Sequence, residues 1–459
     1  MNAITTKYYC RLLKNAAVNV MMNKYHKFRV KLHGKLGVFF LTLIICLAAF
    51  GQDTGNKQKA YSLDDCITIA INNHPGLNIY KHKTGQKKEK LKAVKAEILP
   101  RMESTASYDR LSDVPQAKKS YLGGDNNDFQ LFMGISQTLF AGGGIISRRK
   151  SAELAVDAAE LEFIAAREEI IFMVKTAYFK QLFTRDILNS KKDILKYAEL
   201  SYKTAFDLNK RTKLPREETL LRLEVYLNEI KQELITAQTS YEIAGKALIN
   251  VMGLDAGNAF EILDSPQNEN SGKNTALAIS NNSEILKITK NLKEAEELVK
   301  TAKSGYFPQA RIRGRYGYEF ARLSEGNTDW YIGAAVDFNI LGWIKTRSEV
   351  NQARERQAEI KSYKDWLVRQ KKLEMESACL KYESAKKNIL FAEKSIEQAR
   401  KSLELFEKRY VDSLATSIEL MDAQKAFSQA QINYASYLFE MRLAKAEIEK
   451  TGGSYYDIK

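Results

Sequence analysis

The chain has 459 residues, of which 28% are charged and 44% hydrophobic, and it contains only 6 Pro and 24 Gly. This composition excludes a disordered, collagenous or disulfide-stapled chain, and the apolar residues are not gathered into the repeated runs of a polytopic helical membrane protein. Residues 1–51 hold eight basic residues and no acidic one, so only +7 of the net charge of +15 belongs to the rest of the chain. That mild excess contains no basic block, and we expect no nucleic-acid partner.

The N-terminal residues 1–51 have the pattern of a secretory signal peptide. An apolar run over 36–50 follows the basic stretch, and small residues stand at Ala49 and Gly51. We expect cleavage after Gly51, which places the mature chain outside the cytoplasm. An uncleaved signal anchor is the structural alternative. Three methionines are candidate start positions: Met1, Met21 and Met22.

The mature chain is predicted to contain two structural repeats, residues 52–275 and 276–459. The apolar residues of 220–248 recur with the same 3-4-3-4 spacing in 420–448. A sustained seven-residue repeat keeps one apolar seam against a partner helix, so each repeat should contain a coiled-coil-like helical hairpin. The stretch 147–211 contains no Pro or Gly. A helix of that length, roughly 100 Å at 1.5 Å per residue, exceeds the scale of a compact domain.

The two repeats are predicted to share one order of elements. In the first we expect a helix, two strands, a long helical hairpin and a linker, at 62–98, 100–111, 128–140, 147–250 and 254–275. In the second we expect a helix, two strands, a long helical hairpin and then a short tail, with the elements at 276–305, 308–320, 328–340 and 345–450. Ser62 and Asp65 have the spacing of a capping box at the start of the first helix.

The four expected strands alternate between apolar and polar residues. In 310–320 one face carries residues such as Ile312 and Tyr316, and the other carries charged residues. Each strand is about 11 to 13 residues long, close to the 9 to 11 residues of a tilted transmembrane strand. Trp330 and Trp343 bracket the last strand as interfacial aromatic residues do. Alternation alone favours a soluble, half-buried sheet, whereas the secretory signal and the long helices favour a sheet in a membrane.

Four strands cannot close a barrel, and an open sheet edge cannot lie in lipid. If these strands span a membrane, the chain must therefore oligomerise. A barrel of 12 strands from three chains is the smallest natural arrangement with an aqueous lumen, because about 8 strands leave room only for side chains.

Three local motifs accompany this order of elements: residues 61–75 at the mature start, 137–143 at a strand-to-helix turn, and Arg409-Tyr410 followed by 420–424 near the second hairpin tip. Together with the duplication they resemble the TolC-type outer membrane efflux protein family of Gram-negative bacteria. The resemblance extends from about Tyr61 to Gly453.

The resemblance implies a mainly α fold with a transmembrane β-barrel portion. Four strands per chain would join a trimeric 12-stranded barrel in the outer membrane, and the hairpins would form a periplasmic α-helical barrel. Such proteins are passive ducts rather than enzymes and use no cofactor. They are the outer membrane channel subunits of tripartite efflux systems, in contact with outer membrane lipids, and they receive substrate from an inner-membrane pump through a periplasmic adaptor protein.

The resemblance also implies that the adaptor docks at the hairpin tips. The tip residues here are Leu214, Pro215, Ser413 and Leu414. The family's tips often carry Gly after Arg-Tyr, whereas Ser413 stands near that place in this chain. The choice of adaptor therefore stays open.

Relatives carry acidic residues that narrow the periplasmic entrance, and the matching positions here are Glu419 and Asp422. Three residues apart, they share one helix face, and three copies would form two anionic rings. The alternative for Glu419 is structural, because residues 416–419 also have the spacing of a capping box.

Four charged strand residues are candidates for the lumen wall: Arg311, Arg313, Arg315 and Asp337. Arginines that line a lumen favour anions. The alternative, which we favour from sequence alone, is that the arginines pair with carboxylates of neighbouring strands, such as Asp337.

Nothing in the sequence assembles a catalytic or metal site. Gly142–Gly144 is not followed by the Gly-Lys-Ser/Thr of a phosphate loop, and His74 and His82 have no zinc spacing with Cys. The rival to a channel is a coiled-coil structural or signalling protein held by an uncleaved anchor, which leaves the four alternating segments unexplained.

Overall fold

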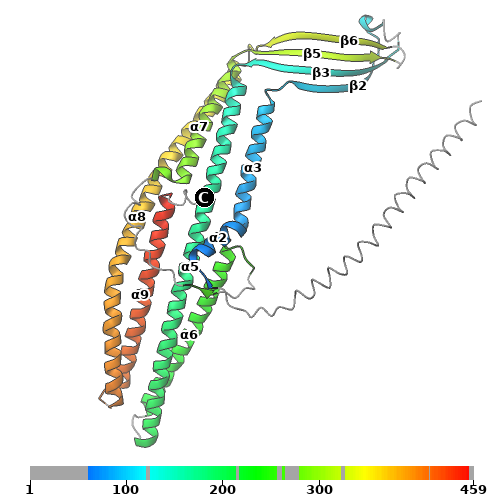
Figure 1. Cartoon of the computed structure of the whole chain (residues 1–459). Coiled ribbons are helices and arrows are strands. Elements are labelled where there is room, and N and C mark those ends of the chain that lie inside the picture. Colours follow the sequence, from blue (N-terminus) through cyan, green and yellow to red (C-terminus); the bar gives the residue numbers. More distant parts are fainter. Residues whose placement is uncertain are drawn as a thin grey trace, which may run out of the picture. The chain divides into compact units, whose positions relative to one another are not determined.

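The computed structural model describes residues 60–119, 125–212, 217–255, 261–263, 279–321, 326–412 and 414–453. These residues lie in one compact unit, Ala60–Lys459 (Figure 1). The expected signal peptide, most of the linker, and the tip residues Leu214, Pro215 and Ser413 lie outside the described residues. None of the described helices is long and apolar enough to cross a membrane.

Four strands form one antiparallel sheet in the order β2-β3-β5-β6. Their bounds are Arg101–Arg110, Asn127–Ala141, Gln309–Phe320 and Gly326–Asp337. The strand β3 of the first repeat pairs with β5 of the second along its length, for example Met133 with Tyr316. One sheet therefore contains strands from both repeats.

The last strand, β6, ends at Asp337 and not at residue 340 as expected. Asp337 pairs with Gln309, the first residue of β5, and Pro308 before it has no N–H to extend the ladder. For the same reason β5 begins at 309 and not at 308. Beyond the sheet, the N–H of Gly342 donates to the carbonyl oxygen of Asn339 in a turn that leads into the next helix.

The strand β3 enters its helix through a tight glycine turn. Gly142 and Gly143 have φ values of 57° and 78°, in the left-handed region that side chains other than glycine rarely adopt. A Cβ on Gly142 would also lie 2.7 Å from Cβ of Phe307. The turn between the end of β3 and α5 therefore requires glycine at positions 142 and 143.

Four long helices make up the two hairpins. They are α5 (Gly144–Thr212) with α6 (Glu217–Val251), and α8 (Trp343–Val411) with α9 (Ser417–Thr451). Each hairpin packs along its length, and α5 also packs against α9, so the two hairpins lie side by side (Figure 1). Residues of the expected seams, such as Ile230 and Phe427, are buried in one hydrophobic cluster where these helices meet.

The helix expected over 62–98 is wrong as a single element, because it is broken into α2 (Leu63–Asn73) and α3 (Pro75–Ala96). Pro75 lacks an N–H and is the first residue of α3, and His74 before it is extended, with ψ at 118°. The capping box of Ser62 and Asp65 is confirmed at the start of α2.

The helix expected over 276–305 begins later, as α7 (Ser283–Lys303) after the short helix η3 (Ile279–Asn281). Asn282 caps α7, since its Oδ1 accepts a hydrogen bond of 3.0 Å from the N–H of Glu284. The short helix η4 (Ser304–Tyr306) then connects α7 to β5.

A second hydrophobic cluster, which includes Cys66 of α2, Tyr178 of α5 and Leu248 of α6, joins the first helix to the first hairpin. β1 (Ala60–Tyr61) pairs with β4 (Glu261–Ile262) in parallel. The fully buried Tyr178 of α5 donates a hydrogen bond of 2.5 Å from its hydroxyl to the carbonyl oxygen of Leu263. This contact anchors the pair of short strands on α5.

Candidate functional site: the two faces of the sheet and the hairpin ends

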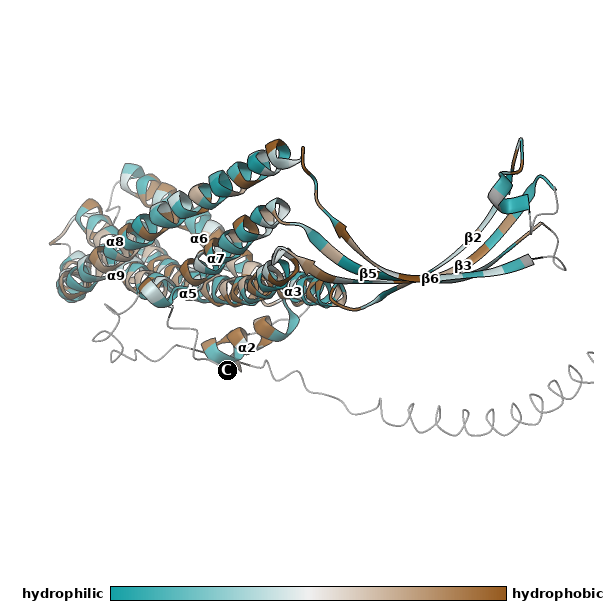
Figure 2. Cartoon of the chain, turned by 90° about the horizontal axis from the view of Figure 1, so that it is seen from above, coloured by the Kyte–Doolittle hydropathy of each residue, from teal (hydrophilic) through white to brown (hydrophobic). Residues whose placement is uncertain are grey.

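One face of the sheet, here called the apolar face, exposes large hydrophobic side chains. Trp330 and Ile332 are 68% and 74% exposed, and Met133 is 59% exposed. Phe129 stacks on Phe320 with ring centroids 5.4 Å apart. In Figure 2 hydrophobic and hydrophilic residues succeed one another along these strands. An exposed apolar face of this extent marks a surface that a membrane or a partner protein covers.

The opposite face, here called the polar face, carries every charged residue of the four strands except Arg110 of β2. Strand alternation and the register place these residues on it: Arg101, Glu103, Asp109, Asp128, Arg311, Arg313, Arg315, Glu319, Asp329 and Asp337. The four candidates for the lumen wall are therefore brought together on one face.

The three candidate arginines have different surroundings. Nε of Arg311 donates a 2.8 Å hydrogen bond to Oδ2 of Asp337, so the expected ion pair forms there. The guanidinium of Arg315 lies over the ring of Phe132, 3.2 Å from its centroid. Within the described residues, no ion pair joins Arg313 or Arg315 to a carboxylate.

An ion-pair cluster that was not expected from the sequence joins the connection between β2 and β3 to the polar face, at the end of the strands away from the helices. Lys118, in the short helix η1 (Gln116–Lys118), forms ion pairs with Asp128 of β3, at 2.7 Å, and with Glu319 of β5. Both carboxylates are buried. No local pattern marks this lysine, because its partners lie on two other strands.

At the second hairpin end the two candidate gate residues differ in role. The capping box predicted as the alternative for Glu419 is confirmed: its Oε2 accepts a hydrogen bond of 2.7 Å from the N–H of Thr416. This bond and one from the Thr416 hydroxyl lower the pKa of the Glu419 carboxyl. Asp422 is exposed one turn later. Leu414 is 69% exposed, and its N–H donates to the carbonyl oxygen of Arg409.

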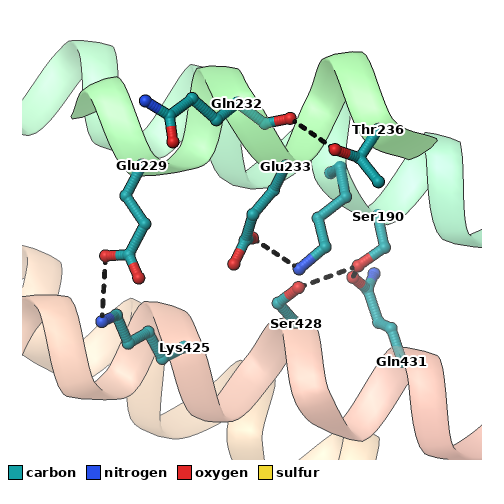
Figure 3. A network of polar contacts seen from close by, with 9 residues as sticks. Ser190, Glu229, Gln232, Glu233, Thr236, Lys425, Ser428 and Gln431 are labelled. Carbon is teal, nitrogen blue, oxygen red and sulfur yellow. Dashed lines mark hydrogen bonds and ion pairs between the residues drawn. The ribbon is translucent and has the colours of Figure 1, made fainter. Parts of the chain in front are cut away.

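A polar network lies between the hairpins, also not found from the sequence (Figure 3). Ser190 of α5 donates a 2.8 Å hydrogen bond to Oε1 of Gln431 of α9, and Gln424 donates one of 3.0 Å to Ser201. Gln424 is fully buried. The only sequence signal was the presence of small polar residues inside otherwise apolar helix faces.

Beside this network is a cavity of about 490 Å³ between α5 and α6, with Lys191 and Glu233 among its lining residues. These two side chains form an ion pair of 2.8 Å. Among the residues that the structure describes, no group of three or more His, Cys, Asp or Glu is placed to hold a metal ion.

Residues 66–254 and 275–454 match the outer membrane efflux protein family. The chain belongs to this family. Like its relatives, it is an outer membrane protein whose helical part extends into the periplasm, as its sequence predicted.

Similar proteins agree with this assignment. The chain is 22% identical over 330 residues to Nodulation protein T of Rhizobium leguminosarum bv. trifolii, across 68% of this chain and 69% of that protein. Its fold is similar to the outer membrane channel CmeC of Campylobacter jejuni, with a TM-score of 0.76, 17% identity and 85% of each chain covered. The outer membrane protein VceC of Vibrio cholerae has a TM-score of 0.76 and 18% identity, over 85% of this chain and 96% of that chain.

These likenesses confirm the predicted fold class, mainly α with a four-stranded portion of a membrane β-barrel. In an outer membrane efflux protein the two faces of such a sheet correspond to two environments. An apolar face of this kind suits contact with lipid, and a charged face suits contact with water.

Proposed function

We propose that this outer membrane efflux protein is the channel subunit of a tripartite export system and works as a passive trimeric duct from the periplasm to the exterior. The observation that carries the proposal is the sheet itself. It exposes a wide apolar face, yet both of its outer strands, β2 and β6, lack a second partner strand within the described residues.

Unpaired backbone groups of an edge strand cannot lie in lipid, because each unsatisfied N–H or C=O costs several kcal/mol there. Pairing β6 of one copy with β2 of the next removes both edges. Three copies give 12 strands, and the polar faces then surround a water-filled lumen. The rival, a coiled coil held by an anchor, leaves the apolar face without a suitable environment.

The hairpins support the same assembly. Both α6 and α8 expose large apolar side chains along their length, for example Val225 at 69% on α6 and Phe391 at 69% on α8. Exposed apolar stripes on long helices indicate a further helical partner. A second copy of this chain supplies one without any other protein.

The partners we propose are a periplasmic adaptor at the hairpin tips and, through it, an inner-membrane pump. Leu414 is exposed at the second tip, as a docking residue must be. We extend the proposal to Leu214, Pro215 and Ser413, and assign Asp422 to the periplasmic entrance.

The test is electrophoresis of the purified outer membrane fraction, with and without boiling in detergent, followed by planar-bilayer recording of the unboiled species. We expect a band of trimer size that boiling converts to the monomer, and stepwise conductance from the trimer. A monomer in both lanes, or a trimer without conductance, contradicts the proposal.

A further inference from the structure

Two arginines from different repeats lie in one row of the polar face. Arg101 of β2 pairs with Ser136 of β3, Ser136 pairs with Arg313 of β5, and Arg313 pairs with Gly333 of β6. Side chains opposite one another in paired strands point to the same face. Strands are about 4.8 Å apart, so the two arginine backbones are separated by about 10 Å.

Within the part of the chain that the structure describes, no ion pair is formed by either arginine of this row. Among the described residues, neither Arg101 nor Arg313 has a carboxylate within ion-pair distance. The row nearer the helices contains Arg311, whose charge Asp337 neutralises. In the next row away from the helices, the guanidinium of Arg315 packs against the ring of Phe132. The row of Arg101 and Arg313 thus keeps an exposed positive charge that its neighbours lack.

The row is also accessible. Its other members are the small residues Ser136 and Gly333, and a Cβ added to Gly333 would meet no atom within 4 Å. Arg101 and Arg313 are both exposed. A ligand that approaches the polar face therefore reaches both guanidinium groups without displacing a bulky side chain.

Most carboxylates of the polar face lie away from this row. The exceptions are Asp337, which pairs with Arg311, and Glu103, whose side chain lies over Gly134 in the next row. Asp109, Asp128, Glu319 and Asp329 lie toward the end of the strands farthest from the helices, where Lys118 bridges two of them. The positive row and the acidic end are therefore separate zones along the strands.

We propose that Arg101 and Arg313 form an anion-binding ring inside the barrel, six guanidinium groups in the trimer, which binds carboxylate, sulfate or phosphate groups of exported molecules. The proposal rests on the trimeric channel proposed above. Guanidinium presents a planar fork of N–H donors that matches such oxyanions, and rings of arginine favour anions in pores. The exported molecules are accordingly anionic.

The test is block of single-trimer current in planar bilayers by hexacyanoferrate(III), a trivalent anion. We expect reversible block of the wild type, and a double variant Arg101→Gln, Arg313→Gln that needs about tenfold more anion for half block, because two charge-assisted contacts are lost. The matched control is Arg110→Gln, which removes an arginine from the same strand but on the apolar face, opposite Asn127. It should leave the block unchanged.

Two further variants separate charge from structure. Arg101→Lys with Arg313→Lys keeps both charges and should retain block, whereas Gly333→Asp puts a carboxylate beside Arg313 and should weaken block with both arginines present. If the wild type conducts but is not blocked, or if the Gln variant is blocked equally, the ring is refuted and the channel stands. If neither the wild type nor any variant conducts, the proposed channel function is itself contradicted.

Discussion

At the scale of single residues, the sheet distinguishes neighbours by the face on which they lie. Ile332 and Gly333 are consecutive in β6, but Ile332 is 74% exposed on the apolar face and Gly333 lies on the polar face. Because side chains alternate, the same substitution at these two positions meets two different environments.

We predict that Ile332→Asp reduces the amount of trimer in the outer membrane severalfold, because a carboxylate on the lipid face loses its hydration. Gly333→Asp, the matched control one residue away, should assemble normally, since its side chain faces water and has space. The measurement is the yield of heat-modifiable trimer. Equal yields for the two variants are incompatible with a lipid-facing apolar face.

Glu168 of α5 gives a prediction on pH. It is 4% exposed, and its Oε1 has no hydrogen-bond partner within the described residues. Burial raises the pKa of its carboxyl above the ordinary value. The folded chain therefore binds the proton of the Glu168 carboxyl more tightly than the unfolded chain does. Protonation of Glu168 stabilises the fold fully below the pKa of the unfolded state, about 4.3. This contribution is lost as the pH rises through the pKa of the folded state.

We therefore expect Glu168→Gln to melt at a higher temperature than the wild type at about pH 8, with the difference shrinking toward about pH 4.5. Circular dichroism of the protein in detergent measures it. Glu199→Gln, at an exposed position of the same helix, is the control and should not show this trend. If the difference in melting temperature between this variant and the wild type did not change with pH, the buried charge of Glu168 would not destabilise the folded state.

At the scale of elements, the connection between β2 and β3 is held by contacts remote in sequence. Lys118 joins η1 to β3 and β5, and Val114 of the same connection is buried against Ala321 and Leu111. Loops are ordinarily the most mobile parts of a sheet protein. Here one cation between two buried carboxylates holds the described part of this connection, residues 111–119, against the sheet.

We predict that Lys118→Gln loosens the connection and makes it severalfold more sensitive to protease added to intact cells, because two buried carboxylates then repel without a cation between them. Adding Glu319→Gln should restore much of the resistance. Lys119→Gln, the exposed neighbour, is the control. Unchanged cleavage of the Lys118 variant would show that the ion pairs do not hold the connection.

At the scale of the whole molecule, two kinds of surface have no partner among the described residues of one copy. They are the outer edges of β2 and β6 and the apolar stripes of α6 and α8. The trimer proposed above would cover these surfaces together, and its axis would determine whether Asp422, exposed near the second hairpin end, meets the Asp422 of the other copies.

We predict that Asp422→Ala lowers the cation preference of the trimer in planar bilayers without lowering its melting temperature. Thr416→Ala, which removes the cap of α9, should instead destabilise the helix end by about 1 kcal/mol. The pair separates an electrostatic role from a structural one. If Asp422→Ala leaves ion preference unchanged, this residue does not line the entrance.

The sequence by itself determined what depends on local periodicity. The heptad spacing predicted the hairpins, the alternation of 310–320 predicted a two-faced strand, and the motifs predicted the family. The helix break at Pro75 also follows from the local sequence, because proline has no N–H, so the expectation of one helix over 62–98 was wrong for a local reason.

Only the tertiary structure decided which strands are neighbours. That Arg101 and Arg313 share a row, that Arg311 reaches Asp337, and that Lys118 bridges two strands all follow from the pairing of β2 with β3 and of β3 with β5. The two-residue period of a strand predicts on which face of the sheet a side chain lies. It carries no information on the partner strand or its register, because these are set by hydrogen bonds between segments far apart in the chain.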